Sequence, residues 1–253
     1  MTQLKALIFD VDGTLAETER DGHRVAFNLA FKEKHLDWYW DAGTYERLLD
    51  VAGGKERIRF FMDEADTSFN VPIDPEAFVH ELHQRKARHY ASILKSGSIP
   101  LRPGVERLLN EARAMGLRLA IATTSSQKSV ISLLKVNLGA ESIGWFDVIA
   151  AGDIVGNKKP DPDIYLYALE RLKLPAGNCI AFEDSEIGLL SSVRAGLKTV
   201  VTVNAGTRHQ KLGKAEIVLD QLGEPGAAFE VLAGDAGGAA FVDIPMIQRI
   251  FKS

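Results

Sequence analysis

Five short segments of the chain are apolar at successive positions rather than at every second one. They are residues 4–10 (LKALIFD), 117–123 (LRLAIAT), 146–152 (FDVIAAG), 178–184 (NCIAFED) and 198–204 (KTVVTVN). Apolar side chains on both faces are typical of strands in a parallel sheet that is covered on both sides. The pattern therefore predicts five buried parallel strands, and residues 215–220 (AEIVLD) predict a weaker sixth.

Segments with helical spacing separate the last four of these strands. They are residues 104–116, 125–139, 162–174 and 185–196, and the first two end at Gly116 and Gly139. Alternation of strand and helix predicts an α/β fold with a doubly wound parallel sheet and right-handed crossovers. A terminal helix is expected near 244–252, and the Gly- and Ala-rich residues 223–240 are expected to form a loop.

A long helical segment interrupts this alternation after the first strand. Roughly 80 residues lie before the next α/β unit, far more than a crossover loop needs. Helical patterns cover residues 19–35, 54–65 and 74–95. We interpret residues 16–95 as an inserted all-helical cap domain with hinges near 15–19 and 95–101. Residues 1–15 and 96–253 then form the α/β core domain.

Composition narrows the class of protein. The 253 residues are 46% hydrophobic and 25% charged with a net charge of −4, which indicates neither a nucleic-acid partner nor a polyanionic tail. Cys179 is the single cysteine, so an internal disulfide is impossible and a reducing compartment is expected. No apolar run approaches the ~20 residues that span a bilayer, and no signal-peptide pattern precedes the first strand. We expect a cytoplasmic monomer, or a protein of an organelle stroma after removal of a transit peptide.

Polar side chains follow the predicted strands at their carboxyl ends, where open parallel sheets bind ligands. The first strand leads to Asp10 and Asp12, the second to Thr123, Thr124 and Ser125, the third to Asp153 and NKKPDPD, and the fourth to Glu183 and Asp184. Several carboxylates in one crevice need a cation, and hard oxygen ligands favour Mg²⁺. Together with hydroxyls and a lysine, such a site suits a phosphoryl group.

These residues also resemble a known family. DVDGT at 10–14, Thr123, Lys159 in KKPDPD and EDS at 183–185 resemble, in order and spacing, the four motifs of the haloacid-dehalogenase-like phosphatases. The helical insertion is similar to the helical cap of that superfamily. The stretches LIFDVDGTLAETERDGHRVAFN and DVAGGKERI resemble the CbbY-type phosphatases, which are associated with removing sugar bisphosphates that inhibit the carbon-fixing carboxylase.

The resemblance implies a role for each motif residue. Asp10 is expected to be the nucleophile that forms an aspartyl phosphate, since a carboxylate needs no deprotonation at neutral pH. Asp12 is expected to be the general acid and then the base. The Asp10 side chain, the Asp12 carbonyl and Asp184 are expected to bind Mg²⁺, with Glu183 assisting.

Thr123 and Lys159 are expected to hold the phosphoryl oxygens, with Thr124 and Ser125 beside them. Lys158 is the alternative to Lys159, which we prefer because the lysine of the family directly precedes a proline. Thr123 can instead cap the following helix.

Four residues of the expected cap side are candidates for substrate contact: Glu17, Gly53, Gly54 and Lys55. Lys55 can meet a second phosphate, but a glycine-rich turn before a charged helix explains GGKER equally well. The aromatic residues of DWYWD (37–41) are interpreted as cap packing, His80 and His83 as helix-surface residues, and Cys179 as an inert core residue.

The leading hypothesis is a Mg²⁺-dependent phosphatase that acts on a small phosphorylated sugar, with xylulose 1,5-bisphosphate as first candidate. Phosphoglycolate phosphatase and a phosphomutase of the β-phosphoglucomutase kind stay open as alternatives. A non-catalytic binding or regulatory protein is expected to have lost a nucleophile or a metal ligand. Asp10, Asp12, Lys159 and Asp184 are all present, which argues against that last alternative.

Overall fold

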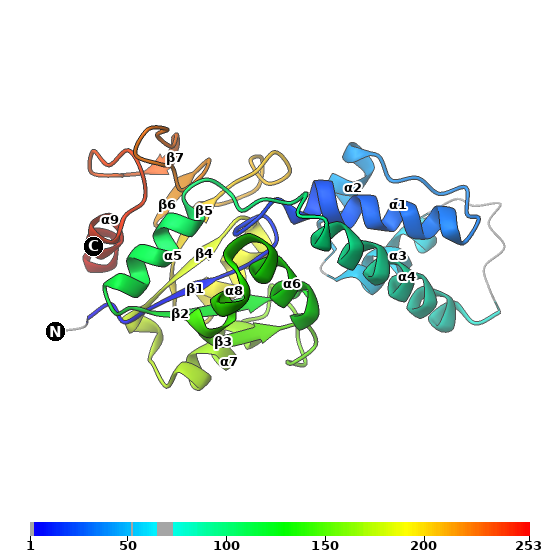
Figure 1. Ribbon diagram of the computed structural model, residues 1–253, viewed down its shortest axis with the longest axis horizontal. Helices are drawn as coiled ribbons and strands as arrows, with labels where there is room; N and C mark the ends of the chain where they lie inside the picture. Colours follow the sequence, from blue (N-terminus) through cyan, green and yellow to red (C-terminus); the bar gives the residue numbers. More distant parts are fainter. Residues whose placement is uncertain (1–2, 52, 65–72) are drawn as a thin grey trace. The chain divides into compact units, whose positions relative to one another are not determined.

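The chain forms two compact units, each described here by itself (Figure 1). The computed structural model describes residues 3–51, 53–64 and 73–253. The α/β unit comprises Met1–Glu17 and Pro100–Ser253, and the helical unit comprises Thr18–Ile99. The expected insertion, 16–95, differs from the helical unit at both ends. Ala16 forms an antiparallel bridge with Leu101 inside the α/β unit, and the Cδ1 atom of Ile99 lies close to Gly22 in the helical unit.

All five predicted core strands are present and parallel. They are β1 (Ala6–Phe9), β2 (Arg118–Thr123), β3 (Phe146–Ala151), β4 (Cys179–Glu183) and β5 (Lys198–Thr202). With β6 (Ile217–Leu219) and β7 (Val231–Gly234) they form one sheet in the order β3-β2-β1-β4-β5-β6-β7. The order grows outward from β1 in both directions, as in a doubly wound sheet. The predicted α/β fold is therefore confirmed.

The prediction of a loop over 223–240 is wrong, because β7 lies within it. β7 pairs antiparallel with β6, and Gly234 stands opposite Ile217. Its residues are exposed or half-buried, although Val231, Leu232 and Ala233 are apolar. Backbone pairing with β6 and packing of Leu232 against a buried cluster that includes Val218 place this strand at the edge of the sheet.

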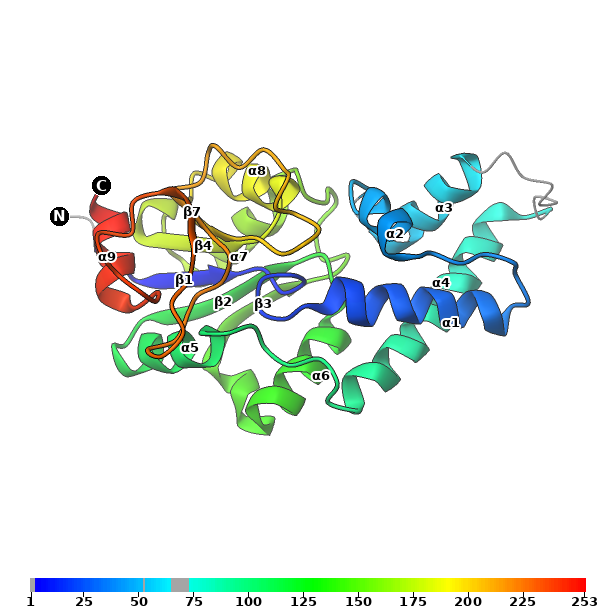
Figure 2. The same ribbon diagram turned by 90° about the horizontal axis from the view of Figure 1, so that it is seen from above.

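Helices cover both faces of the sheet. Figure 2 shows α5 (Val105–Ala114) and α6 (Gln127–Leu138) on one side, with α7 (Asp163–Leu172) and α8 (Glu186–Arg194) on the other. Short 3₁₀ segments, Ala140–Trp145 and Ala176–Asn178, precede β3 and β4, and α9 (Ile244–Lys252) ends the chain. Ala6 and Ile8 of β1 pack in the same apolar cluster as Tyr165 and Ala168 of α7, because alternate strand residues face this side.

The helical unit has four α-helices in its described residues. They are α1 (Arg24–Glu33), which follows a π-helical turn (Glu19–His23), α2 (Ala42–Leu48), α3 (Gly54–Glu64) and α4 (Pro75–Lys95). The sequence pattern did not predict α2, which is short and is capped by Asp41 accepting from the Thr44 N–H. Trp40 is buried between Phe27 and Phe31, with ring centroids 4.6 and 4.8 Å away. Packing by the DWYWD segment is thus confirmed, although Tyr39 is 69% exposed.

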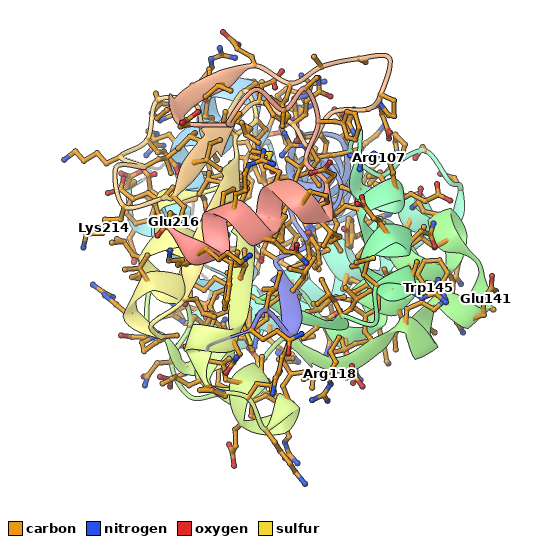
Figure 3. The ribbon with its side chains drawn as sticks, turned by 90° about the vertical axis from the view of Figure 1, so that its left-hand side faces the viewer. Arg107, Arg118, Glu141, Trp145, Lys214 and Glu216 are labelled. Atoms are coloured by element: carbon orange, nitrogen blue, oxygen red, sulfur yellow. The ribbon has the colours of Figure 1, made fainter. Side chains whose placement is uncertain are left out.

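Arg118 and Trp145 lie on the side of the α/β unit at which the strands begin, which Figure 3 views face-on. Arg118, the first residue of β2, pairs with Asp147 at 3.1 Å, and the guanidinium of Arg113 lies 3.9 Å from the ring centroid of Trp145. The predicted ligand site is expected at the opposite edge, where the strands end. Among the described residues, no helix has the length and apolarity that a membrane crossing requires.

Candidate active site

Three carboxylates converge at the carboxyl ends of β1 and β4. Asp10 directly follows β1, Glu183 ends β4, and Asp184 comes next. Phe9 stands opposite Phe182 in the neighbouring strand, and the Asp10 N–H donates to the Phe182 carbonyl at 3.0 Å. Ligand oxygens of the three carboxylates all lie within 4.8 Å of one another. The side-by-side pairing of β1 and β4 thus brings together acidic residues 173 positions apart (183 − 10).

Lys159 supplies positive charge to this cluster. Its Nζ donates to Asp10 Oδ1 and to Glu183 Oε1, both at 2.6 Å. Lys159 is 6% exposed, Asp10 6% and Glu183 1%, so the contacts are shielded from water. The neighbouring Lys158 instead pairs with Asp153 at 3.5 Å. Of the two lysines, Lys159 is therefore the one that contacts the carboxylates.

Two further side chains donate hydrogen bonds to Glu183 and Asp184. Tyr165 of α7 donates its hydroxyl to Glu183 Oε1 at 2.5 Å, and Asn204 donates its amide to Asp184 Oδ2 at 2.9 Å. Sequence reasoning missed both. Asn204 ends the fifth apolar segment, so its place at a strand end was a usable signal. Tyr165 had none, because an aromatic residue on the apolar face of a helix is ordinarily interpreted as core.

Burial shapes the protonation of the cluster. Burial raises the pKa of Asp10 to about 8, against the opposing effect of Lys159 and with a further rise from Glu183 and Asp12. Burial also raises the pKa of Asp184 well above its ordinary value, and the charges of Asp10 and Glu183 add to this. For Lys159, burial lowers the pKa, but Asp10 and Glu183 outweigh it and the pKa lies above its usual range. Burial thus favours the protonated forms of Asp10 and Asp184 more than Lys159 favours their charged forms.

Two glycines make room for the carboxylates. A Cβ atom on Gly13, whose φ is +86°, would lie 2.2 Å from Asp184 Oδ2. A Cβ atom on Gly188, at the start of α8, would lie 1.9 Å from Glu183 Oε2. Any other residue at these positions would displace an acidic side chain of the cluster. Gly13 of DVDGT is therefore required both by its positive φ and by the close approach of the Asp184 carboxylate.

The donor set fits a hard divalent cation. Asp10, Glu183 and Asp184 offer carboxylate oxygens, the ligands that Mg²⁺ prefers. Burial raises the pKa of Asp10 and of Asp184, and a bound cation would favour their charged forms. Among the described residues, His80 and His83 are not part of a group able to hold a metal ion. His80 contacts Gln84 at 2.8 Å, in keeping with its interpretation as a helix-surface residue.

Comparison with known proteins identifies the family. The haloacid dehalogenase-like hydrolases match residues 4–196 of the chain. This chain belongs to the haloacid dehalogenase-like hydrolases. It is similar to the plasmid-encoded CbbY protein of Cupriavidus necator, with 46% identity over 222 residues, 88% of this chain and 87% of that protein.

Two solved structures of CbbY from Rhodobacter sphaeroides are also similar to this hydrolase. One, in complex with phosphate, has a TM-score of 0.81 at 42% identity and covers 87% of this chain and 95% of that one. The other is a variant in complex with xylulose-(1,5)-bisphosphate, with a TM-score of 0.81 at 41% identity and the same coverage. The chain is thus a CbbY homologue within a family of phosphatases, as its motifs predicted.

The remaining predicted residues of this hydrolase lie in both units. Thr123 ends β2, beside β1, and its Oγ1 accepts from the Ser125 N–H at 3.2 Å. Helix α6 is capped by Ser126, so Thr123 is not its N-cap. Thr124 and Ser125 follow, half-buried, and Asp12 is half-buried two residues after Asp10.

The glycine–lysine candidates belong to the helical unit. Gly53 has a φ of +102°, Gly54 begins α3, and Lys55 follows it. A Cβ atom on Gly54 would lie 2.8 Å from His83 Nε2, so this glycine is needed for packing within the unit. Burial, together with the charges of Lys86 and Lys55, lowers the pKa of His83 to about 4.

Arg102 links the loop that follows β1 to residues at the ends of β5 and β6. The sequence pattern did not point to this residue. Its Nε pairs with Glu17 Oε1 at 3.0 Å, although Glu17 was expected to contact substrate. Its other donors go to the backbone carbonyls of Gly13, Thr202 (2.8 Å), Val203 (2.7 Å) and Asp220 (2.6 Å). The guanidinium has five N–H donors, and these contacts occupy all of them. The four carbonyl partners leave no pattern in a sequence, because they are backbone atoms.

Proposed function

We propose that this hydrolase is a Mg²⁺-dependent phosphatase that removes a phosphoryl group from a small sugar phosphate, with xylulose 1,5-bisphosphate as the first candidate. The observation that carries the proposal is the buried Asp10 carboxylate, bonded to Lys159 and grouped with Glu183 and Asp184 at one sheet edge. The similarity to a CbbY that binds this bisphosphate supports the choice of substrate. With that substrate, the protein would serve carbon fixation by removing an inhibitory sugar bisphosphate.

In the proposed first step, a carboxylate oxygen of Asp10 attacks phosphorus. The bond between phosphorus and the ester oxygen breaks, and Asp12 gives its proton to the departing alkoxide. In the second step Asp12 takes a proton from water, the water oxygen attacks the aspartyl phosphate, and inorganic phosphate leaves. Asp10 and Asp12 are then back in their starting states.

Lys159 is placed for both steps. Its ammonium nitrogen lies 2.6 Å from Oδ1 of Asp10, an oxygen of the attacking carboxylate. From there it can donate to a phosphoryl oxygen as negative charge builds up, which is the stabilisation that matters most in phosphoryl transfer. Asp10, Asp184 and the Asp12 carbonyl would hold Mg²⁺, which supplies further positive charge to the phosphoryl group when bound.

For a bisphosphate, we propose that Lys55 and the adjoining backbone of Gly53 and Gly54 bind the second phosphate. A charge-assisted hydrogen bond of this kind contributes about 1.5–3 kcal/mol when water is excluded. Lys55→Ala should then lower kcat/KM for a bisphosphate by roughly ten- to a hundredfold and for a monophosphate much less. Lys95→Ala, an exposed lysine at the end of α4, is the matched control.

The proposal is tested by assaying phosphate release from xylulose 1,5-bisphosphate, phosphoglycolate and hexose phosphates with Mg²⁺ and in excess chelator. We expect preference for the bisphosphate and reversible loss of activity on chelation. An isomeric sugar phosphate without free phosphate would identify a mutase instead. Equal losses on both kinds of substrate in Lys55→Ala would assign Lys55 a structural role, and no loss would leave the bisphosphate proposal without support in the helical unit.

A further inference from the structure

We propose that Tyr165 is a positioning residue of this reaction: its hydroxyl holds Glu183 so that the Lys159 ammonium stays shared between Glu183 and the nucleophile Asp10. The inference rests on the proposed function, since it concerns the same site. It extends that function to a residue on helix α7, outside the strand-end motifs.

The contacts form a chain of three short hydrogen bonds. The Tyr165 hydroxyl and Lys159 Nζ donate to the same oxygen, Glu183 Oε1, at 2.5 and 2.6 Å. Lys159 Nζ donates in turn to Asp10 Oδ1 at 2.6 Å. Tyr165 is thus linked to the nucleophile through three hydrogen bonds, with Glu183 and Lys159 between them.

The surroundings of Tyr165 fix the direction of its hydroxyl. The side chain is fully buried, and its ring packs in the apolar cluster that contains Ala6, Ala168 and Cys179. Lys159 Nζ also lies 5.1 Å from the centroid of the same ring, which favours the ammonium at this place. Leaving a buried hydroxyl without a hydrogen-bond partner in apolar surroundings costs free energy, and this cost favours the bond to Glu183.

The charges around Glu183 indicate the role of the hydrogen bond from Tyr165. Glu183 is a buried carboxylate, and Oε2 faces the Asp184 N–H at a long 3.4 Å. Without the phenol, the lysine would become the main donor to Oε1, and the ammonium would be drawn toward Glu183. Because the ammonium would then lie closer to Glu183, its contacts with Asp10 and with an arriving phosphoryl group would weaken. The phenol therefore keeps the lysine available to the reacting atoms.

Tyr165→Phe tests this, because it keeps the ring and removes only the hydroxyl. We expect kcat/KM for the preferred phosphate ester to fall roughly tenfold, with most of the loss in kcat, since Lys159 acts on charge that develops in the transition state. Tyr167→Phe is the matched control: Tyr167 lies on the same helix, and its ring contacts Arg171 instead of the site. Kinetic constants of Tyr165→Phe within twofold of wild type would overturn the proposal, as would equal losses in the two variants.

A second measurement separates positioning from packing. Inorganic phosphate is titrated by calorimetry into the wild type, Tyr165→Phe, Glu183→Gln and the double variant, in the same Mg²⁺ buffer. If Tyr165 acts through Glu183, its replacement weakens phosphate binding in the wild-type background and has little further effect beside Glu183→Gln. The same loss in both backgrounds would mean that Tyr165 acts independently of Glu183. Absence of phosphatase activity in the wild type would refute the proposed function, whereas the phosphate titrations still decide the role of Tyr165.

Discussion

Replacing Gly188 by alanine should destabilise the protein, although alanine ordinarily favours a helix. Gly188 lies in the first turn of α8, where glycine costs about 0.8–1.0 kcal/mol relative to alanine, so helix propensity alone predicts a gain in stability. The added Cβ atom, however, would lie 1.9 Å from Glu183 Oε2 and 2.2 Å from its Cδ. The carboxylate would have to move.

A flexible side chain would give way at little cost, but this one is tethered. Lys159 and Tyr165 both donate to Glu183, and a hydrogen bond to a charged group contributes about 1.5–3 kcal/mol. Overpacking in a filled core adds about 1–3 kcal/mol. With the propensity gain subtracted and one tether lost, we expect the free energy of unfolding to fall by about 1.5–5 kcal/mol. Turnover should fall at least about tenfold, because Lys159 moves with its partner.

Urea denaturation and a phosphate-release assay measure the two effects. Gly144→Ala is the matched control, because a Cβ atom there meets no described atom within 4 Å, and its stability should change by less than about 0.5 kcal/mol. If Gly188→Ala were as stable as the wild type and fully active, the carboxylate would not be held in the way described, and the reasoning from its tethers would fail.

Two further predictions concern the acidic cluster. Asp10→Asn should leave the fold intact, with a melting temperature at or above that of the wild type, and reduce turnover more than about a hundredfold; residual activity above about a hundredth would refute its role as nucleophile. The pKa of Asp10 is about 8 in the folded chain and 3.8 ordinarily, so between these values the folded state binds more protons, and metal-free stability falls as the pH rises. Mg²⁺ replaces that proton, so thermal denaturation should show a larger Mg²⁺-induced stabilisation at about pH 8 than at about pH 5; equal shifts would contradict this.

The convergence of charged residues at one sheet edge could be predicted from the sequence. Asp10, Glu183 and Asp184 each follow an apolar run long enough for a buried strand, and parallel strands end at the same edge. Lys159 could be placed near them only by resemblance, because it lies in a loop after β3 and its contact with Asp10 depends on the tertiary path of that loop.

Other parts of the molecule left no local signal. β7 is a four-residue edge strand within a Gly- and Ala-rich segment, so its short apolar run was not recognised as a strand. Arg102 is a charged residue that becomes buried because backbone carbonyls from distant segments surround it. Helix α2 is too short to show a helical period clearly. For Arg102, the stabilising partners are far away in the sequence.

The antiparallel bridge between Ala16 and Leu101 has a consequence for how this chain can evolve. The two points at which the chain leaves and re-enters the α/β unit are adjacent, and the Arg102 N–H donates to the Leu15 carbonyl across them at 2.8 Å. The α/β unit therefore closes this junction with its own backbone, and the strand register does not depend on what the intervening residues form. Long insertions between adjacent ends cost little conformational entropy, since that cost grows only with the logarithm of length. The helical unit can accordingly be shortened, replaced or redesigned for another ligand as a separate module, while the acidic cluster at the sheet edge stays as it is.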